Sequence, residues 1–187
     1  MSEFLDALKD IGKELSNCLS NISVADALQA IEQLVLADRV FVAGVGRSGL
    51  AMRAFAMRLM HLGKPVQVVG DVTTPAITAN DLLILGSGSG STSSLLLAAN
   101  RARKLGCRII LITADPESVI ALVAETVVRI DAPTPKAEST SGSVSTQPMG
   151  SLFEQSLFIL LDAFIMALMP RLDETEESMF ERHANME

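Results

Sequence analysis

The chain has 187 residues, of which 49% are hydrophobic and 20% are charged, and its formal net charge is −7. This composition indicates a globular protein with a core and argues against general binding to nucleic acid, which depends on clustered Lys and Arg. The acidic N-terminus is unlike a signal peptide, and the longest apolar run, residues 157–169, is interrupted by Asp162, so we expect no membrane span.

The two cysteines, Cys18 and Cys107, lie in separate apolar contexts without the spacing of a metal site. Buried thiols in a reducing compartment are the simplest interpretation, and we predict a cytoplasmic protein. The chain also holds nine Met and no Trp or Tyr, and its apolar content is hard to bury in a monomer of this length. We therefore expect an oligomer that buries helix faces between subunits.

Apolar residues with helical spacing alternate along the chain with short, continuously apolar runs. Residues 4–19 repeat apolar side chains at three- and four-residue steps, and a second helix, residues 24–36, follows Ser23 as a suitable N-cap. The remaining elements are predicted, in chain order, as strand 39–43, helix 48–62, strands 65–69 and 81–85, helix 93–105, strand 107–113, helix 116–123, strand 126–130, and helices 151–169 and 173–183.

Continuously apolar strands separated by helices indicate a parallel sheet that is covered on both faces. We predict an α/β fold, a three-layer αβα sandwich around a five-stranded parallel sheet of the flavodoxin-like or Rossmann-like kind. A single domain is expected over residues 1–187, with N-terminal helices in 1–37, the α/β core in 38–150 and C-terminal helices in 151–187.

Two of the predicted strands end in glycine-rich loops. The first loop, Gly44-Val-Gly-Arg-Ser-Gly49, matches the dinucleotide fingerprint G-x-G-x-x-G and has Asp71 beyond it, but the chain has no room for a second, substrate-handling domain. The second loop, Gly86-Ser-Gly-Ser-Gly-Ser-Thr92, stands between a buried strand and a helix, where backbone N–H groups and hydroxyls can donate to phosphate oxygens. No Lys follows it, so it favours a single phosphate monoester over a triphosphate; a flexible Gly/Ser linker is the alternative.

The second loop resembles the phosphosugar loop of the sugar isomerase (SIS) fold. Further stretches look like the small single-domain branch of that fold, the 6-phospho-3-hexuloisomerase family: Val42-Ala-Gly-Val-Gly-Arg-Ser-Gly49, Ala56-Met-Arg-Leu-Met-His-Leu-Gly63, Gly150-Ser-Leu-Phe-Glu154 and Phe180-Glu-Arg-His-Ala-Asn185. The resemblance implies interconversion of D-arabino-hex-3-ulose 6-phosphate and D-fructose 6-phosphate in the ribulose monophosphate pathway of formaldehyde fixation. It also implies a homotetramer that needs no organic cofactor and no metal.

This reaction needs a base that removes the proton at C2, giving an enediolate, and returns a proton at C3. Glu154, in the first turn of an apolar helix, is the predicted base. From the residues alone, Ser151 as N-cap with Glu154 three positions on would equally describe a capping box. The resemblance favours catalysis, because the glutamate of this stretch is the family's base.

The other predicted site residues are polar groups of the two loops and the two histidines. His61 and His183 are candidates for proton transfer to a substrate oxygen, and the sequence does not choose between them; His61 could instead serve the helix dipole. Arg47 could equally be a solvated loop charge, and Ser48 a plain N-cap. The predicted substrate- and phosphate-binding residues are Gly46, Arg47, Ser48, Ser87, Gly88, Ser89, Gly90, Ser91 and Thr92.

Two alternative functions stay open at this point. A SIS-type module could bind a sugar phosphate without catalysis, but such modules usually accompany a DNA-binding domain, and the first two predicted helices are short and acidic. A different aldose–ketose phosphate isomerase on the same fold would keep the mechanism and change the sugar.

Overall fold

The short apolar runs form a five-stranded parallel sheet in the computed structural model, which describes residues 2–134 and 144–186. The strand order is β2-β1-β3-β4-β5, and every neighbouring pair is parallel, so the predicted α/β fold is confirmed. The strands are β1 Val40–Gly44, β2 Val66–Val68, β3 Leu82–Gly86, β4 Arg108–Thr113 and β5 Thr126–Arg129.

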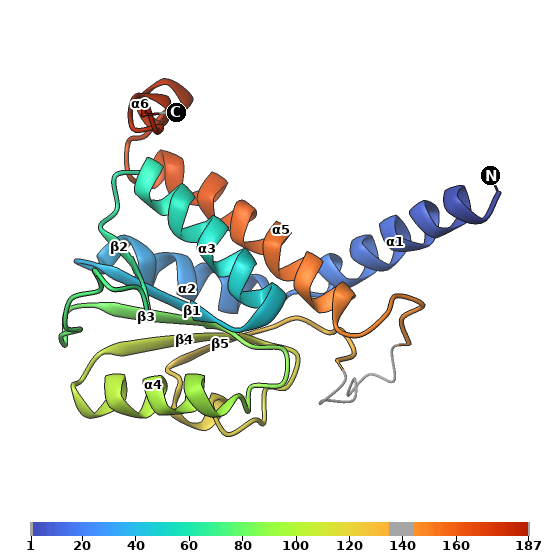
Figure 1. Cartoon of the computed structure of the whole chain (residues 1–187), viewed down its shortest axis with the longest axis horizontal. Helices are drawn as coiled ribbons and strands as arrows, with labels where there is room; N and C mark the ends of the chain where they lie inside the picture. Colours follow the sequence, from blue (N-terminus) through green and yellow to red (C-terminus); the bar gives the residue numbers. More distant parts are fainter. Residues whose placement is uncertain (1, 135–143, 187) are drawn as a thin grey trace.

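Helices cover both faces of this sheet, which gives three layers (Figure 1). Helices α2, α3 and α5 lie on one face, and α4 with the short turn η1 lies on the other; α1 packs against α5 and projects away from the sheet (Figure 1). The helices are α1 Ser2–Ser20, α2 Val24–Leu36, α3 Gly46–His61, α4 Ser93–Lys104, α5 Ser151–Leu168 and α6 Glu176–Glu181, with 3₁₀ turns η1 Ala121–Val123 and η2 Met169–Arg171.

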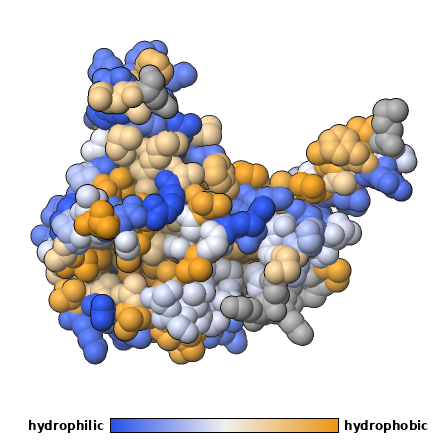
Figure 2. All heavy atoms as spheres, in the orientation of Figure 1, coloured by the Kyte–Doolittle hydropathy of each residue, from blue (hydrophilic) through white to orange (hydrophobic). Residues whose placement is uncertain are grey.

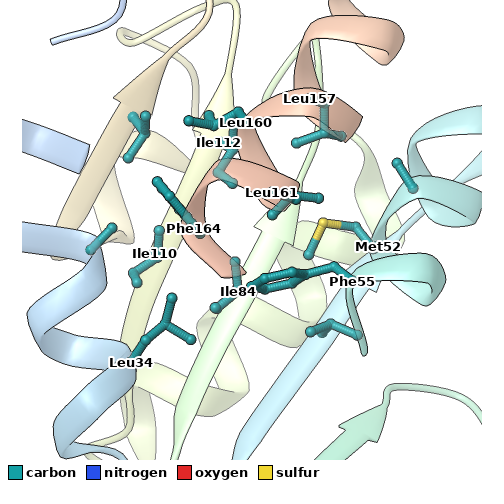
Figure 3. Packing of buried hydrophobic residues seen from close by; sticks show 14 of the residues in the cluster. Leu34, Met52, Phe55, Ile84, Ile110, Ile112, Leu157, Leu160, Leu161 and Phe164 are labelled. Carbon is teal, nitrogen blue, oxygen red and sulfur yellow. The ribbon is translucent and has the colours of Figure 1, made fainter. Parts of the chain in front are cut away.

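Alternation along the strands divides the core into two clusters. Val42 and Ile84 point toward α2, α3 and α5, whereas Phe41 and Leu83 point toward α4. The first cluster is the larger, and Figure 3 shows side chains of α3 and α5 interleaved above the sheet, with Phe55 beside Ile84. The sheet is therefore buried on both sides, as its continuously apolar strands predict.

Three predicted elements differ from the structure. Helix α3 begins at Gly46, two residues before the predicted start, because the chain turns directly from β1 into the helix. The predicted helix 116–123 is reduced to the single turn η1, and the predicted helix 173–183 to the six residues of α6.

The predicted N-cap of the second helix is confirmed: the Ser23 hydroxyl accepts a hydrogen bond from the Asp26 N–H at 3.3 Å. Residues 135–143 of the predicted connection lie outside the described residues.

By length and composition alone, the segment Ser151–Arg171 is long and apolar enough to cross a membrane, despite the charge of Asp162. Half of the most apolar part of this segment is buried inside the protein. Leu157, Leu161 and Phe164 of α5 belong to the main core cluster between α3 and the sheet (Figure 3). This burial is typical of the central helix of a globular domain.

The order of the strands creates a crevice at one edge of the sheet. Strands β1 and β3 are neighbours, and Gly44 at the end of β1 pairs with Gly86 at the end of β3. From these two glycines the chain leaves to opposite faces, into α3 on one side and α4 on the other. Such a switch point is where ligands bind in open parallel sheets.

Candidate active site

The turn from β1 into α3 depends on contact between two glycine backbones. A Cβ atom on Gly44 would lie 2.9 Å from the backbone nitrogen of Gly49, and one on Gly49 would lie 2.7 Å from the Gly44 oxygen. The N-cap residue of α3 is Val45, which offers no side-chain hydrogen bond, so the reading of Ser48 as an N-cap is wrong. Ser48 instead lies inside the first turn, where it is largely buried beside the crevice.

The second glycine loop carries its hydroxyls into the start of α4. Thr92 is the N-cap residue of this helix, yet its side chain makes no capping hydrogen bond. Its Oγ1 atom lies 3.5 Å from Oγ of Ser87, which is buried at the end of β3. Gly90 has a φ of +55°, and a Cβ atom there would collide with the side chain of Ser118. The loop is thus a fixed turn of the fold, and the linker interpretation is wrong.

Glu154 enters the same region from α5. The N-cap of α5 is Gly150, and the Glu154 N–H donates to the Gly150 oxygen at 3.0 Å, as a residue within the helix does. The capping box between Ser151 and Glu154 is therefore not formed. The Glu154 side chain is 20% exposed, and its Oε2 atom accepts a hydrogen bond from Arg47 Nε at 2.5 Å. Arg47, which is 63% exposed, pairs with this carboxylate across the crevice.

The two glycine-rich loops and the first turns of α5 enclose a cavity of about 310 Å³. This volume is close to the lower limit of roughly 300 Å³ for ordinary ligand pockets. The helices α3, α4 and α5 all begin at its wall, and none of the three has a side-chain hydrogen bond from its N-cap. Helices α2 and α6, which begin elsewhere, are both capped by a side chain. Helix N-termini carry partial positive charge and unpaired N–H groups, so the cavity suits an anion. The lining residues are Val45, Gly46, Ser48, Gly86, Ser87, Gly88, Ser89, Thr92, Leu95, Thr134, Met149, Gly150, Phe153 and Glu154.

Six of the nine predicted binding residues line this cavity, and three do not. Arg47 is not part of the wall and reaches the site only through its hydrogen bond to Glu154. Gly90 and Ser91 are absent from its wall: Gly90 packs against Ser118, and the exposed Ser91 hydroxyl donates to Ser89 at 3.1 Å. The sequence did not indicate Thr134 or Met149, because both lie in a connection without periodicity or motif.

The two histidines meet each other at the opposite end of α3. Their rings stack with centroids 5.4 Å apart, beside a separate cavity that is also lined by Arg58 and Phe180. His61 stands 13 residues after Ser48, which is about 20 Å along a helix. Burial, with the neighbouring charges of Arg58 and His183, lowers the pKa of His61. Within one chain, the structure does not bring either histidine to Glu154.

Asp71, which completed the dinucleotide pattern, is engaged elsewhere. Its carboxylate accepts hydrogen bonds from Arg53 of α3 at 2.7 and 3.2 Å. The dinucleotide interpretation requires this acid to face a ribose at the crevice. The ion pair with Arg53 therefore argues against Asp71 as the ribose-binding acid of the dinucleotide fingerprint.

Residues 33–160 match the model of the SIS domain family, and the chain belongs to this family. It is similar to the 3-hexulose-6-phosphate isomerase of Mycobacterium gastri, with 44% identity over 97% of this chain and 96% of that one. It is also 42% identical to the 3-hexulose-6-phosphate isomerase of Bacillus subtilis, over 95% of this chain and 96% of the relative. Among solved structures, a Methanococcus jannaschii protein with an inferred 3-hexulose-6-phosphate isomerase function superposes with a TM-score of 0.84 at 33% identity, covering 97% of this chain and 99% of that one.

Proposed function

We propose that this protein is a 3-hexulose-6-phosphate isomerase, which interconverts D-arabino-hex-3-ulose 6-phosphate and D-fructose 6-phosphate through an enediolate. The similarity to enzymes of that name extends over nearly the whole chain. The observation that carries the proposal is the crevice itself, where one carboxylate, Glu154, faces a cavity bordered by three helix N-termini that no side chain caps. We place the reaction in the ribulose monophosphate pathway.

The start of α4 is the proposed phosphate site. Its first N–H groups are free of a side-chain cap, and Ser87, Ser89 and Thr92 present hydroxyl groups to the same cavity. A phosphate held there accepts hydrogen bonds from both kinds of donor and is favoured by the helix dipole. Holding the phosphate there would fix the sugar carbons relative to Glu154, which lines the same cavity.

Glu154 is the proposed base. In the direction of fructose 6-phosphate, its carboxylate removes the proton from C2, the electron pair moves toward the C3 carbonyl, and an enediolate with its charge on O3 forms. The proton of the C2 hydroxyl passes to O3, the carbonyl forms at C2, and the protonated Glu154 delivers its proton to C3. Arg47 holds the carboxylate in place before substrate binds, through the hydrogen bond from its Nε atom. As Glu154 takes up the proton, Arg47 and the backbone N–H groups at the start of α3 would stabilise the enediolate oxygen.

Assembly into a tetramer is part of the proposal. Phe4, Leu5 and Leu8 are more than half exposed on the projecting part of α1, and Figure 2 shows apolar residues along that arm. In such an assembly, His61 or His183 of one subunit would act at the cavity of another. We also propose a cytoplasmic location, which fits two free, buried cysteines.

Proton exchange from fructose 6-phosphate in deuterated water tests the function. Isomerisation between C2 and C3 exchanges the C3 proton, so ¹H NMR should show the C3 signal disappearing while the C1 signals persist. An aldose–ketose isomerase would exchange a C1 proton instead. A binding module would exchange neither, and either of these results would refute the proposal.

A further inference from the structure

Glu14 joins α1 to the segment that leads into α5. Its Oε2 atom accepts hydrogen bonds from Ser145 Oγ at 2.6 Å and Gln147 Nε2 at 3.0 Å. Its Oε1 atom accepts from the backbone N–H of Thr146 at 2.8 Å and from the Thr146 hydroxyl at 2.9 Å. A carboxylate has about four acceptor positions, so this one is saturated by a single short segment. Burial alone would raise the pKa of Glu14, but these hydrogen bonds outweigh it and lower the pKa to about 2.

The same segment continues into the wall of the substrate cavity. Met149 and Gly150 line the cavity, and Glu154 follows within the first turns of α5. Met149 has a φ of +59°, a conformation that a residue with a side chain holds only where flanking contacts fix it. One flanking contact is the hydrogen bond from Ser151 N–H to the Pro148 oxygen, at 3.2 Å.

The segments that line the cavity differ in what holds them in place. The strand-end loops of the cavity, such as Gly86–Ser89, continue directly from the central sheet. Residues 144–149 form neither helix nor strand. Glu14 itself stands on a fixed base, because Leu15 packs against the main core cluster and Cys18 is buried in it. Through its hydrogen bonds, the Glu14 carboxylate therefore fixes the irregular residues 145–147 to a helix that packs against the core.

We propose that Glu14 is a positioning residue for the isomerase site: it ties residues 145–147 to α1 and so keeps Met149 and Gly150 in place as one wall of the substrate cavity. This inference rests on the proposed function. The helix that carries Glu154 is anchored in the main core cluster through residues such as Leu157 and Leu161, and the phosphate site lies at the start of α4, so neither depends on this tie alone. Loss of Glu14 should consequently weaken substrate binding and leave the chemical step nearly unchanged.

The test compares Glu14→Gln with Asp10→Asn, a control that removes the same charge from an exposed position one turn earlier in α1. Gln offers one acceptor oxygen in place of two and turns an NH₂ group toward donors. We expect the KM for fructose 6-phosphate to rise about fivefold or more in Glu14→Gln, with kcat within about twofold of wild type. Hydrogen exchange should accelerate in residues 144–150. Gln147→Ala should raise KM in the same direction, and non-additively with Glu14→Gln.

Four results would overturn the inference: an unchanged KM, a fall in kcat alone, an equal effect of Asp10→Asn, or wild-type hydrogen exchange in residues 144–150 of Glu14→Gln. Loss of assembly by Glu14→Gln in sedimentation would overturn it as well, because the effect would then arise at the subunit interface. Failure of the proposed function would be distinguishable from failure of this inference. In that case the wild-type protein would not turn over fructose 6-phosphate, and hydrogen exchange would still show whether Glu14 orders residues 144–150.

Discussion

Substitution of Thr92 by Val separates phosphate binding from helix capping. Thr92 is the N-cap of α4, a position where loss of a capping hydroxyl usually costs about 1 kcal/mol of stability. Its hydroxyl makes no capping hydrogen bond in this structure, so Thr92→Val should change the free energy of unfolding by less than about 0.5 kcal/mol. If the hydroxyl serves the substrate, the cost appears in binding instead.

The expected loss follows from the chemistry of the contact. A hydrogen bond to a charged group contributes about 1.5–3 kcal/mol, and each 1.4 kcal/mol is tenfold, so the KM should rise roughly 10- to 150-fold. Ser23→Ala is the matched control, because Ser23 does cap its helix, at 3.3 Å from the Asp26 N–H. That variant should lose about 1 kcal/mol of stability and keep its KM.

Steady-state kinetics and urea unfolding of both variants measure these two quantities. The reasoning would be refuted by a Thr92→Val protein that binds fructose 6-phosphate like wild type. It would also be refuted if Thr92→Val lost as much stability as Ser23→Ala, since the hydroxyl would then be a cap.

Three further predictions concern acid stability, assembly and the histidines. Burial opposes ionisation of Asp81, but hydrogen bonds from Arg39 and Thr78 outweigh it and lower its pKa. The stability this carboxylate supplies is therefore present above the unfolded pKa of about 3.9 and lost as pH falls through the lowered value; Asp81→Asn should flatten the acid side of the pH–stability curve in urea titrations. Replacing the exposed apolar residues of α1 at positions 4, 5 and 8 with Ser should shift sedimentation toward smaller species, and unchanged sedimentation would contradict an interface there. If the essential histidine acts across subunits, mixing its Asn variant, His61→Asn or His183→Asn, with a Glu154→Gln protein should restore part of the activity, whereas a mixture as inactive as its components would argue against a shared site.

The sequence carries enough local information to predict the sheet and the crevice. Apolar runs such as residues 81–85 differ clearly from helical spacing, and glycine after two of them marks the strand ends that meet at Gly44 and Gly86. Glu154 could be proposed because it is a carboxylate at the start of an otherwise apolar helix. These features depend on neighbours within a few residues along the chain.

The remaining features depend on contacts between distant parts of the chain. Helix α3 starts at Gly46 because the backbones of Gly44 and Gly49 touch, which propensity does not show. The link from Glu14 to Thr146 spans 132 residues and leaves no local pattern. The sequence also could not show that His61 and Glu154 lie in different cavities, because that separation follows from the direction of α3 across the sheet.

The central claim is that Glu154 removes the proton of a sugar phosphate bound in the crevice. Its most direct test is the rate of C3 proton exchange from fructose 6-phosphate in deuterated water, measured for wild type and Glu154→Gln. Gln keeps the shape and an acceptor for Arg47 but cannot take the proton, so exchange should fall at least ~10²-fold while phosphate-dependent binding changes little. Exchange by Glu154→Gln at the wild-type rate would show that another group is the base and would contradict the account.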